Sequence, residues 1–224
     1  MNILIIAAHP DDEVLGCGGF IKKYSSHHNI NVLILTNGCD TRYGQDMIPT
    51  LQQQARKAAK LLGVKAIHFE NLPNQLLDSI PLLKVTETIE KYLDLIKPEL
   101  VFCHHEGDLN RDHRVVFEAT ATAVRPLPGQ NVHGFYTYFV PSSSDWGSIS
   151  SMKYFSPNVF VPIELELETK VKALSFYESE IRNFPHPRSA EGLRTFAKYF
   201  GTISGTHFAE PFTLVRSLDL HLKQ

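Results

Sequence analysis

The sequence has few cysteines, no long apolar run and no excess of charge of one sign. Its 224 residues include 3 cysteines, which lie far apart without any CxxC pair, so neither a disulfide framework nor a thiolate metal site is indicated. No stretch approaches the roughly 18–20 apolar residues of a membrane span, and no signal-peptide pattern is found. The 22 basic and 24 acidic residues lack the basic excess that nucleic-acid binding usually requires. These absences predict a cytoplasmic protein without a nucleic-acid partner or a membrane span, whose cysteines are buried apolar thiols.

The length and the 43% hydrophobic content predict one globular domain over residues 1–224, since a domain typically takes roughly 100–200 residues. No internal repeat, low-complexity run or linker divides the chain. The sequence leaves open whether the protein forms a homo-oligomer.

Apolar segments typical of buried strands alternate with amphipathic segments typical of helices. Strands are expected at about 2–8, 30–36, 66–69, 100–103, 132–140, 158–161 and 212–215, and helices at about 13–24, 50–62, 81–97, 111–124 and 190–199. This alternation predicts an α/β fold, a three-layer Rossmann-like sandwich with a largely parallel sheet and helices on both faces. In such sheets ligands bind beyond the carboxyl ends of the strands.

One segment has an ambiguous pattern. Residues 163–167 alternate apolar and acidic side chains like a strand. The acidic residues at 166 and 168, however, lie four positions before Lys170 and Lys172, and such pairs favour a helix. A helix is therefore predicted there.

Two polar clusters follow expected strands and should open onto the same edge of the sheet. The first is His9-Pro-Asp-Asp-Glu13, and the second runs from His104 to His113. A catalytic zinc uses three protein ligands and leaves a position for water, and imidazole and carboxylate are typical ligands. His9, Asp12 and His113 could form that set. Asp11 would then lie beside the ion without binding it, and a free carboxylate there could take a proton from an attacking water.

Other interpretations of these residues exist. Aspartates after a strand often cap the next helix, and a histidine inside a helix is more often structural than metal-binding. Gly16, Gly18 and Gly19 lack the GxGxxG spacing of a dinucleotide site, so close packing of a helix against the sheet explains them better. Of His104 and His105, one is expected to be buried and structural and the other to face the site.

The motifs resemble those of a known family. The run AHPDDEVLGCGG at 8–19, with HHEGDLNRDH at 104–113, is similar to the zinc-dependent N-deacetylases of the PIG-L or LmbE-like family. The segments 184–189 and 209–212 extend the resemblance over nearly the whole chain. The resemblance implies one Zn²⁺ per chain on His9, Asp12 and His113, Asp11 as the general base, and a substrate contact from Arg42.

At one position the sequence departs from the family pattern. Many members carry a histidine three residues before the last metal ligand, where this chain has Asn110. Asn110 can donate a hydrogen bond to an oxyanion but cannot supply a proton. The general acid is then Asp11 after it has taken the proton from water, or His186, or His105, and we favour Asp11. Asp112 is expected to orient a histidine.

The resulting prediction is a metal-dependent amidohydrolase that removes an N-acetyl group from an N-acetylglucosamine-type compound and releases acetate and a free amine. His105 and His186 are predicted to bind this substrate with Arg42. Fe²⁺ or another divalent first-row metal could replace zinc. Two alternatives stay open, a non-catalytic carbohydrate or metabolite binder that kept the metal, and a 2-His-1-carboxylate iron oxygenase.

Overall fold

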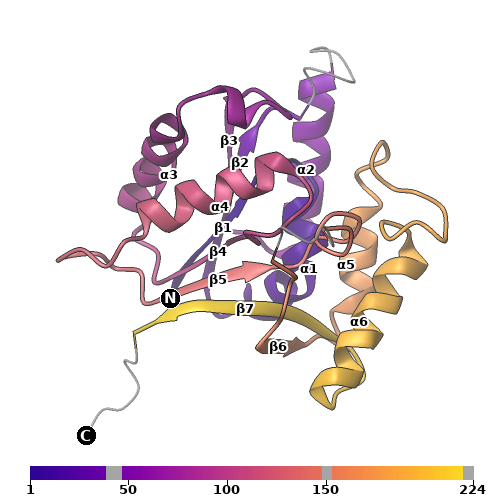
Figure 1. Ribbon diagram of the computed structural model, residues 1–224. Coiled ribbons are helices and arrows are strands. Elements are labelled where there is room, and N and C mark those ends of the chain that lie inside the picture. Colours follow the sequence, from indigo (N-terminus) through magenta and orange to yellow (C-terminus); the bar gives the residue numbers. More distant parts are fainter. Residues whose placement is uncertain (39–46, 148–152, 219–224) are drawn as a thin grey trace, which may run out of the picture.

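The computed structural model describes residues 1–38, 47–147 and 153–218. Figure 1 shows helices on both sides of one twisted sheet. Along the chain the elements are β1 (Asn2–Ala7), α1 (Asp12–Tyr24), β2 (Asn29–Thr36), α2 (Ile48–Leu62), β3 (Ala66–Leu72), the 3₁₀ turn η2 (Leu77–Ser79), α3 (Leu82–Ile96), β4 (Leu100–His104), α4 (Arg111–Ala123), β5 (Gly134–Tyr138), β6 (Val159–Pro162), α5 (Leu167–Leu174), α6 (Ala190–Ser204) and β7 (Ala209–Ser217).

The sheet has seven strands in the order β3-β2-β1-β4-β5-β7-β6. The first five strands of this order are parallel, and β7 runs antiparallel to both β5 and β6. The predicted three-layer α/β fold with a largely parallel sheet is therefore confirmed. The chain enters β1 in the middle of the sheet and adds β4 beside it only after three helices. Consequently the residues that follow these two distant segments meet at one edge.

The continuous apolar run of β1 reflects burial on both faces of the sheet. Ile3 and Ile5 pack with α1, α2 and α5, whereas Leu4 and Ile6 pack with α3 and α4. Successive side chains of a strand point to opposite faces, so a strand covered on both sides must be apolar at every position. Figure 1 shows these two helix layers on either side of the sheet.

The glycines of α1 lie where the helix is packed most closely. A Cβ at Gly16 would be 2.2 Å from the ring of Tyr138 on β5, and one at Gly19 would be 2.7 Å from Ile163. Both distances are too short for any side chain. Close packing of the helix, rather than phosphate binding, therefore accounts for the glycines of this motif.

The helix predicted from residue 163 begins later than expected. Ile163 follows the end of β6 and accepts a hydrogen bond from the backbone N–H of Leu167 at 2.9 Å, and α5 starts only at Leu167. The expected intrahelical pairs also give way to distant partners, because Lys170 pairs with Glu210 and Glu168 pairs with Arg194. Pairs along a helix contribute only about 0.2–0.5 kcal/mol, so tertiary contacts readily override them.

Boundaries of other elements differ from prediction by a few residues. The last helix continues to Ser204, where Gly205 ends it with φ of 77°, and the last strand extends over Ala209–Ser217. Cys17 and Cys103 are buried free thiols, as predicted, and Cys39 lies outside the described residues.

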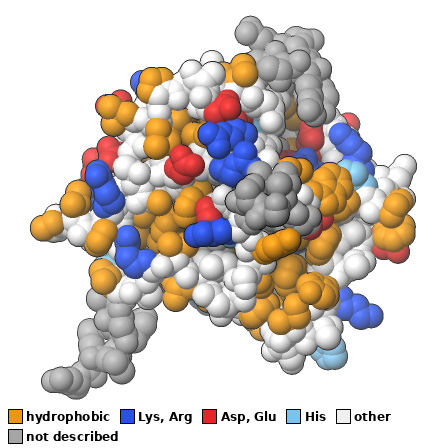
Figure 2. Space-filling view, viewed as in Figure 1, with side chains coloured by type: hydrophobic (Ala, Val, Ile, Leu, Met, Phe, Trp, Pro, Cys, Tyr) orange, Lys and Arg blue, Asp and Glu red, His pale blue; other side chains and the backbone are white. Residues whose placement is uncertain are grey.

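The surface agrees with the nearly balanced charge. In the view of Figure 2, side chains of both signs lie interspersed. Over the described ranges, no helix is both long enough and apolar enough to cross a bilayer.

Candidate active site

The two polar clusters predicted to share a sheet edge do meet there. β1 and β4 are parallel neighbours, and the chain leaves both at the same end. After β1 the backbone turns at His9 and begins α1 at Asp12. After β4 it forms a loop and begins α4, which carries His113 in its first turn.

His9, Asp12 and His113 present one ligand atom each to a common point. His9 Nδ1 lies 3.2 Å from His113 Nε2 and 3.3 Å from Asp12 Oδ2, and His113 Nε2 lies 3.3 Å from Asp12 Oδ2. A tetrahedral ion with ligands at about 2.0–2.1 Å requires ligand atoms about 3.3 Å apart. The three residues therefore form a group that could hold a metal ion.

Asp112 orients the imidazole of His9. Its Oδ2 lies 3.0 Å from His9 Nε2, and because an ionised carboxylate only accepts, Nε2 carries the proton and Nδ1 keeps its lone pair. Asp112 is itself fixed by the backbone N–H groups of Gln75 at 2.7 Å and Leu77 at 3.0 Å. The structure thus places Asp112 where a carboxylate can orient a metal-binding histidine.

Asp108 pairs with the other histidine of the group, His113, and was not among the predicted site residues. Its Oδ1 lies 3.1 Å from His113 Nδ1, which leaves Nε2 for a metal. The buried carboxylate also accepts from the hydroxyls of Ser143 and Ser144 and from the backbone N–H of Asn110. The acidic residue five positions before His113 was the only signal in the sequence, because the two serines come from the loop after β5.

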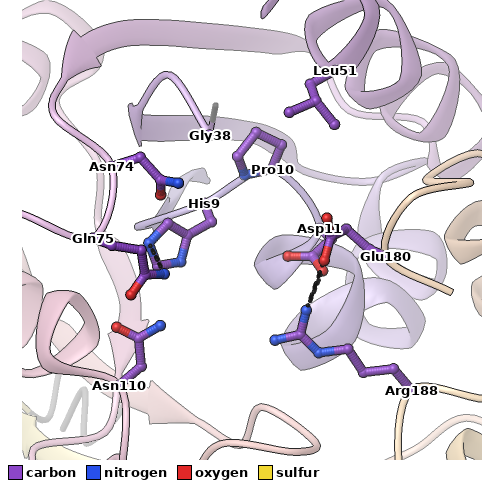
Figure 3. A pocket seen from close by; sticks show the side chains of 10 residues that line it. All are labelled: His9, Pro10, Asp11, Gly38, Leu51, Asn74, Gln75, Asn110, Glu180 and Arg188. Carbon is purple, nitrogen blue, oxygen red and sulfur yellow. Dashed lines mark hydrogen bonds and ion pairs between the residues drawn. The ribbon is translucent and has the colours of Figure 1, made fainter. Parts of the chain in front are cut away.

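The side chain of Asp11 lies on the other side of the cavity from the amides that neighbour His9 (Figure 3). Its Oδ2 accepts a hydrogen bond from Arg188 Nη1 at 3.0 Å, and Arg188 also contacts Glu180 Oε2 at 3.3 Å and Ser142 Oγ at 2.8 Å. Burial raises the pKa of the Asp11 carboxyl well above its usual range, whereas the Arg188 guanidinium lowers it. Asp11 thus carries a buried carboxyl group beside the three candidate ligands but is not one of them.

His9, Asp11 and Arg188 border a cavity of about 200 Å³. Figure 3 shows His9, Asn74, Gln75 and Asn110 on one side of the cavity and Asp11, Glu180 and Arg188 on the other. The lining residues are His9, Pro10, Asp11, Gly38, Leu51, Asn74, Gln75, Asn110, Glu180 and Arg188. Mostly polar walls suit a hydroxyl-rich or amide-bearing ligand.

Asn110 occupies the N-cap of α4 and lines this cavity. Its Oδ1 accepts a hydrogen bond from the backbone N–H of Asp112 at 2.9 Å. Because the carbonyl oxygen is used in the cap, the Nδ2 group is the part that can donate to a ligand, and Figure 3 shows the side chain directed into the cavity.

His104 lies behind the ligands. Its Nε2 accepts the backbone N–H of Ala8 at 2.8 Å, and its ring stacks on His113 with centroids 3.8 Å apart. Burial lowers the pKa of His104 well below its usual range, so the ring is neutral. It supports His113 without facing the cavity.

His105, which was expected to face the substrate, points elsewhere. Its Nε2 lies 3.1 Å from the carbonyl oxygen of Lys153, its Nδ1 lies 2.9 Å from Glu106 Oε2, and it is absent from the cavity lining. The expectation that one of the two adjacent histidines faces the site is therefore wrong for the cavity described here. Residue 105 follows the end of β4 with its side chain turned to the loop before β6.

His186 is close to the cavity without lining it. Its Nδ1 accepts the backbone N–H of Arg188 at 3.1 Å, and its ring meets the indole of Trp146 edge-on, with centroids 5.6 Å apart. It helps to shape the segment that carries Arg188. The predicted substrate contact Arg42 lies outside the described residues.

Sequence reasoning did not single out Arg188, Glu180, Asn74 or Gln75. For Arg188 a signal existed, because it lies in the segment 184–189 that resembles the family. Nothing in the pattern around Asn74 and Gln75 distinguishes them from ordinary loop residues.

The fold, with a three-residue metal group at the carboxyl edge of a parallel sheet, is the arrangement of a metal-dependent hydrolase. The model of the family described as PIG-L: GlcNAc-PI de-N-acetylase matches residues 4–124. The chain belongs to this family.

Three relatives illustrate the similarity. The chain is 27% identical to a diacetylchitobiose deacetylase of Thermococcus kodakarensis, over 99% of this chain and 85% of the relative. It is 30% identical to an uncharacterized deacetylase, YaiS, of Escherichia coli, over 80% of this chain and 91% of the relative. The structure of N,N'-diacetylchitobiose deacetylase from Pyrococcus horikoshii superposes with a TM-score of 0.78 at 24% identity, covering 99% and 86% of the two chains.

Proposed function

We propose that this protein is a metal-dependent N-deacetylase that hydrolyses the N-acetyl group of an N-acetylglucosamine-type sugar to acetate and a free amine. The observation that carries the proposal is the group of His9, Asp12 and His113, which opens through His9 onto a polar cavity that Asp11 also lines. The names of the relatives support the reaction and the class of substrate.

A divalent ion on the three ligands would polarise the amide carbonyl and make water more acidic. Asp11 takes one proton from the attacking water as the new C–O bond forms. Arg188 holds the carboxylate in place. Asn110 Nδ2 donates a hydrogen bond to the oxygen on which negative charge develops. Asp11 then returns its proton to the leaving nitrogen as the C–N bond breaks, so that the amine departs neutral.

Two imidazoles and one carboxylate suit Zn²⁺ in a catalytic site, because zinc accepts three protein ligands and keeps one position open. Fe²⁺ or another first-row ion could use the same donors. We propose zinc as the ion. The single domain, the cytoplasmic location and the homo-oligomer remain predictions.

The test is acetate release by purified, zinc-loaded protein from a panel of N-acetylglucosamine compounds. The panel contains the free sugar, simple glycosides, chito-oligomers, sugar nucleotides and lipid-linked forms. Release from at least one compound by the wild type, but not by an Asp11→Asn protein, is expected. If protein with one zinc per chain releases no acetate from any compound, the proposal is wrong for this substrate class and a binding-only role gains weight.

The carboxylate beside His9 yields a separate prediction on metal affinity. Asp112→Asn is expected to weaken Zn²⁺ binding by about 10–100-fold, because outer partners of ligating histidines fix the ring and its tautomer. Competition with a chelator measures the dissociation constant. Asp78→Asn is the matched control, because Asp78 is half exposed and contacts only Arg111 at 3.8 Å among the ion pairs of the described residues. Equal affinity of the Asp112→Asn and control proteins would contradict the assigned role.

A further inference from the structure

The backbone of Asp11 has an unusual conformation. Its φ is 115° and its ψ is −28°, in a region that residues with a side chain rarely adopt. Two other non-glycine residues with positive φ are Gln75 and Ser142. Gln75 lines the cavity, and Ser142 accepts a hydrogen bond from Arg188. Such backbones persist where surrounding contacts hold them, and they cluster at functional sites.

Glu13 supplies such a contact. Its Oε2 accepts the backbone N–H of Asp11 at 3.1 Å, and its Oε1 accepts a hydrogen bond from the hydroxyl of Tyr177. Glu13 is 1% exposed and Tyr177 is fully buried. Tyr177 follows α5, so the contact ties the turn after β1 to the segment that leads to Arg188.

Glu13 reaches neither the cavity nor the metal ligands by the contacts described. It is absent from the cavity lining, and it is not one of the three candidate metal ligands. Glu13 is buried, and an apolar residue at this position would avoid the cost of desolvating a carboxyl group. A carboxyl group at this position is therefore explained by its two hydrogen bonds, to the Asp11 N–H and to the Tyr177 hydroxyl.

We propose that Glu13, held by Tyr177, is a positioning residue that keeps Asp11 in its left-handed backbone conformation, so that the Asp11 carboxylate faces the cavity beside the metal ligands. The inference rests on the proposed function for Asp11 as the base. It assigns to Glu13 an effect on the proton-transfer step alone, without a part in metal binding or substrate binding.

Three variants separate the contacts. Glu13→Gln keeps an oxygen that can accept the Asp11 N–H, Tyr177→Phe removes only the hydroxyl that holds Glu13, and Glu13→Leu removes both contacts at similar volume. Tyr92→Phe is the matched control, because the Tyr92 hydroxyl also bonds to a carboxylate, that of Glu70 at 2.9 Å, and neither residue lines the cavity.

We expect kcat to fall by about 10–100-fold in Glu13→Leu, since a misplacement of about 1 Å can cost 10²-fold. The loss should be smaller in Tyr177→Phe and smallest in Glu13→Gln, with KM and Zn²⁺ affinity within about twofold of wild type in all three. Tyr92→Phe should retain wild-type kcat. In an Asp11→Asn background, Glu13→Leu should cause no further loss, because residues that act through one group are not additive.

Additive losses in that background would overturn the proposal, as would a wild-type kcat in both Glu13→Leu and Tyr177→Phe. A parallel loss of Zn²⁺ would also overturn it, since Glu13 would then hold Asp12. If Glu13→Leu does not fold, the kcat values of the other two variants test the proposal. The kcat of Tyr177→Phe should then be lower than that of Glu13→Gln, and the reverse order would overturn the proposal.

A readout that needs no turnover separates this proposal from the proposed function. The amide proton of Asp11, measured by NMR hydrogen exchange, should be protected in wild type and in Glu13→Gln and should exchange faster in Glu13→Leu. Equal exchange rates of the Asp11 amide proton in all three proteins would contradict the positioning role of Glu13. If Glu13→Leu loses this protection as expected but the wild-type protein deacetylates no compound, only the proposed function is contradicted.

Discussion

Replacing Asp11 with asparagine is expected to lower kcat by about 10²–10⁴-fold, the usual contribution of a general base. Asparagine has the shape of aspartate but cannot take a proton from water. Because Asp11 is not among the three ligand atoms, the Zn²⁺ content should remain one per chain. Arg188 keeps its contact with Glu180, so the cavity wall should keep its shape. Steady-state acetate release with metal analysis of the same sample measures both quantities.

The control for this variant is Asp94→Asn, an identical change at an exposed carboxylate whose ion pair among the described residues is a local one with Lys97 at 2.8 Å. It should behave as wild type. Activity of Asp11→Asn within a few-fold of wild type would exclude Asp11 as the base. Loss of zinc together with activity would instead make Asp11 a residue that supports the metal ligands.

Lys170→Met is expected to lower the free energy of unfolding by about 3–5 kcal/mol, the usual effect of leaving one partner of a buried ion pair alone. Lys170 Nζ lies 2.7 Å from Glu210 Oε1 and 2.8 Å from the carbonyl oxygen of Leu15. Glu210 in turn accepts the backbone N–H groups of Gly19 and Phe20. In a regular helix the Gly19 N–H bonds to the Leu15 carbonyl. The ion pair therefore satisfies backbone groups in the middle of α1, and its loss affects the helix that carries Asp12.

Denaturant unfolding measures this effect, which would be a large part of the about 5–15 kcal/mol of a typical domain. Lys172→Met, an exposed position two residues along the same helix, is the matched control and should change stability little. The double variant Lys170→Met, Glu210→Gln should lose less than the two single variants together, because it leaves no unpaired buried charge. A Lys170→Met protein as stable as the control would show that Glu210 is already satisfied by the backbone.

Much of the candidate site was predictable because its candidate metal ligands follow strand ends. His9 and Asp12 are three residues apart in one turn, and the sheet topology brings the end of β4 beside them. A pattern of alternating strands and helices is enough to predict that both clusters lie at this edge of the sheet, whereas the pairing of β4 with β1 is set by the strand order. The sequence does not specify the direction of a side chain that leaves a strand end, which is why His105 was placed in the cavity and is found against Lys153.

The sequence by itself determined the α/β architecture, the edge of the sheet that carries the site and the three candidate metal ligands, since these depend on periodicity and on neighbours along the chain. Only the tertiary structure decided the partners of buried charges. Asp11 meets Arg188 across 177 positions, and Lys170 pairs with Glu210, 40 positions away, rather than with the glutamate one helical turn before it. A buried charge must find a partner wherever the packing brings one within reach, and which distant surfaces are buried together is a property of the whole fold.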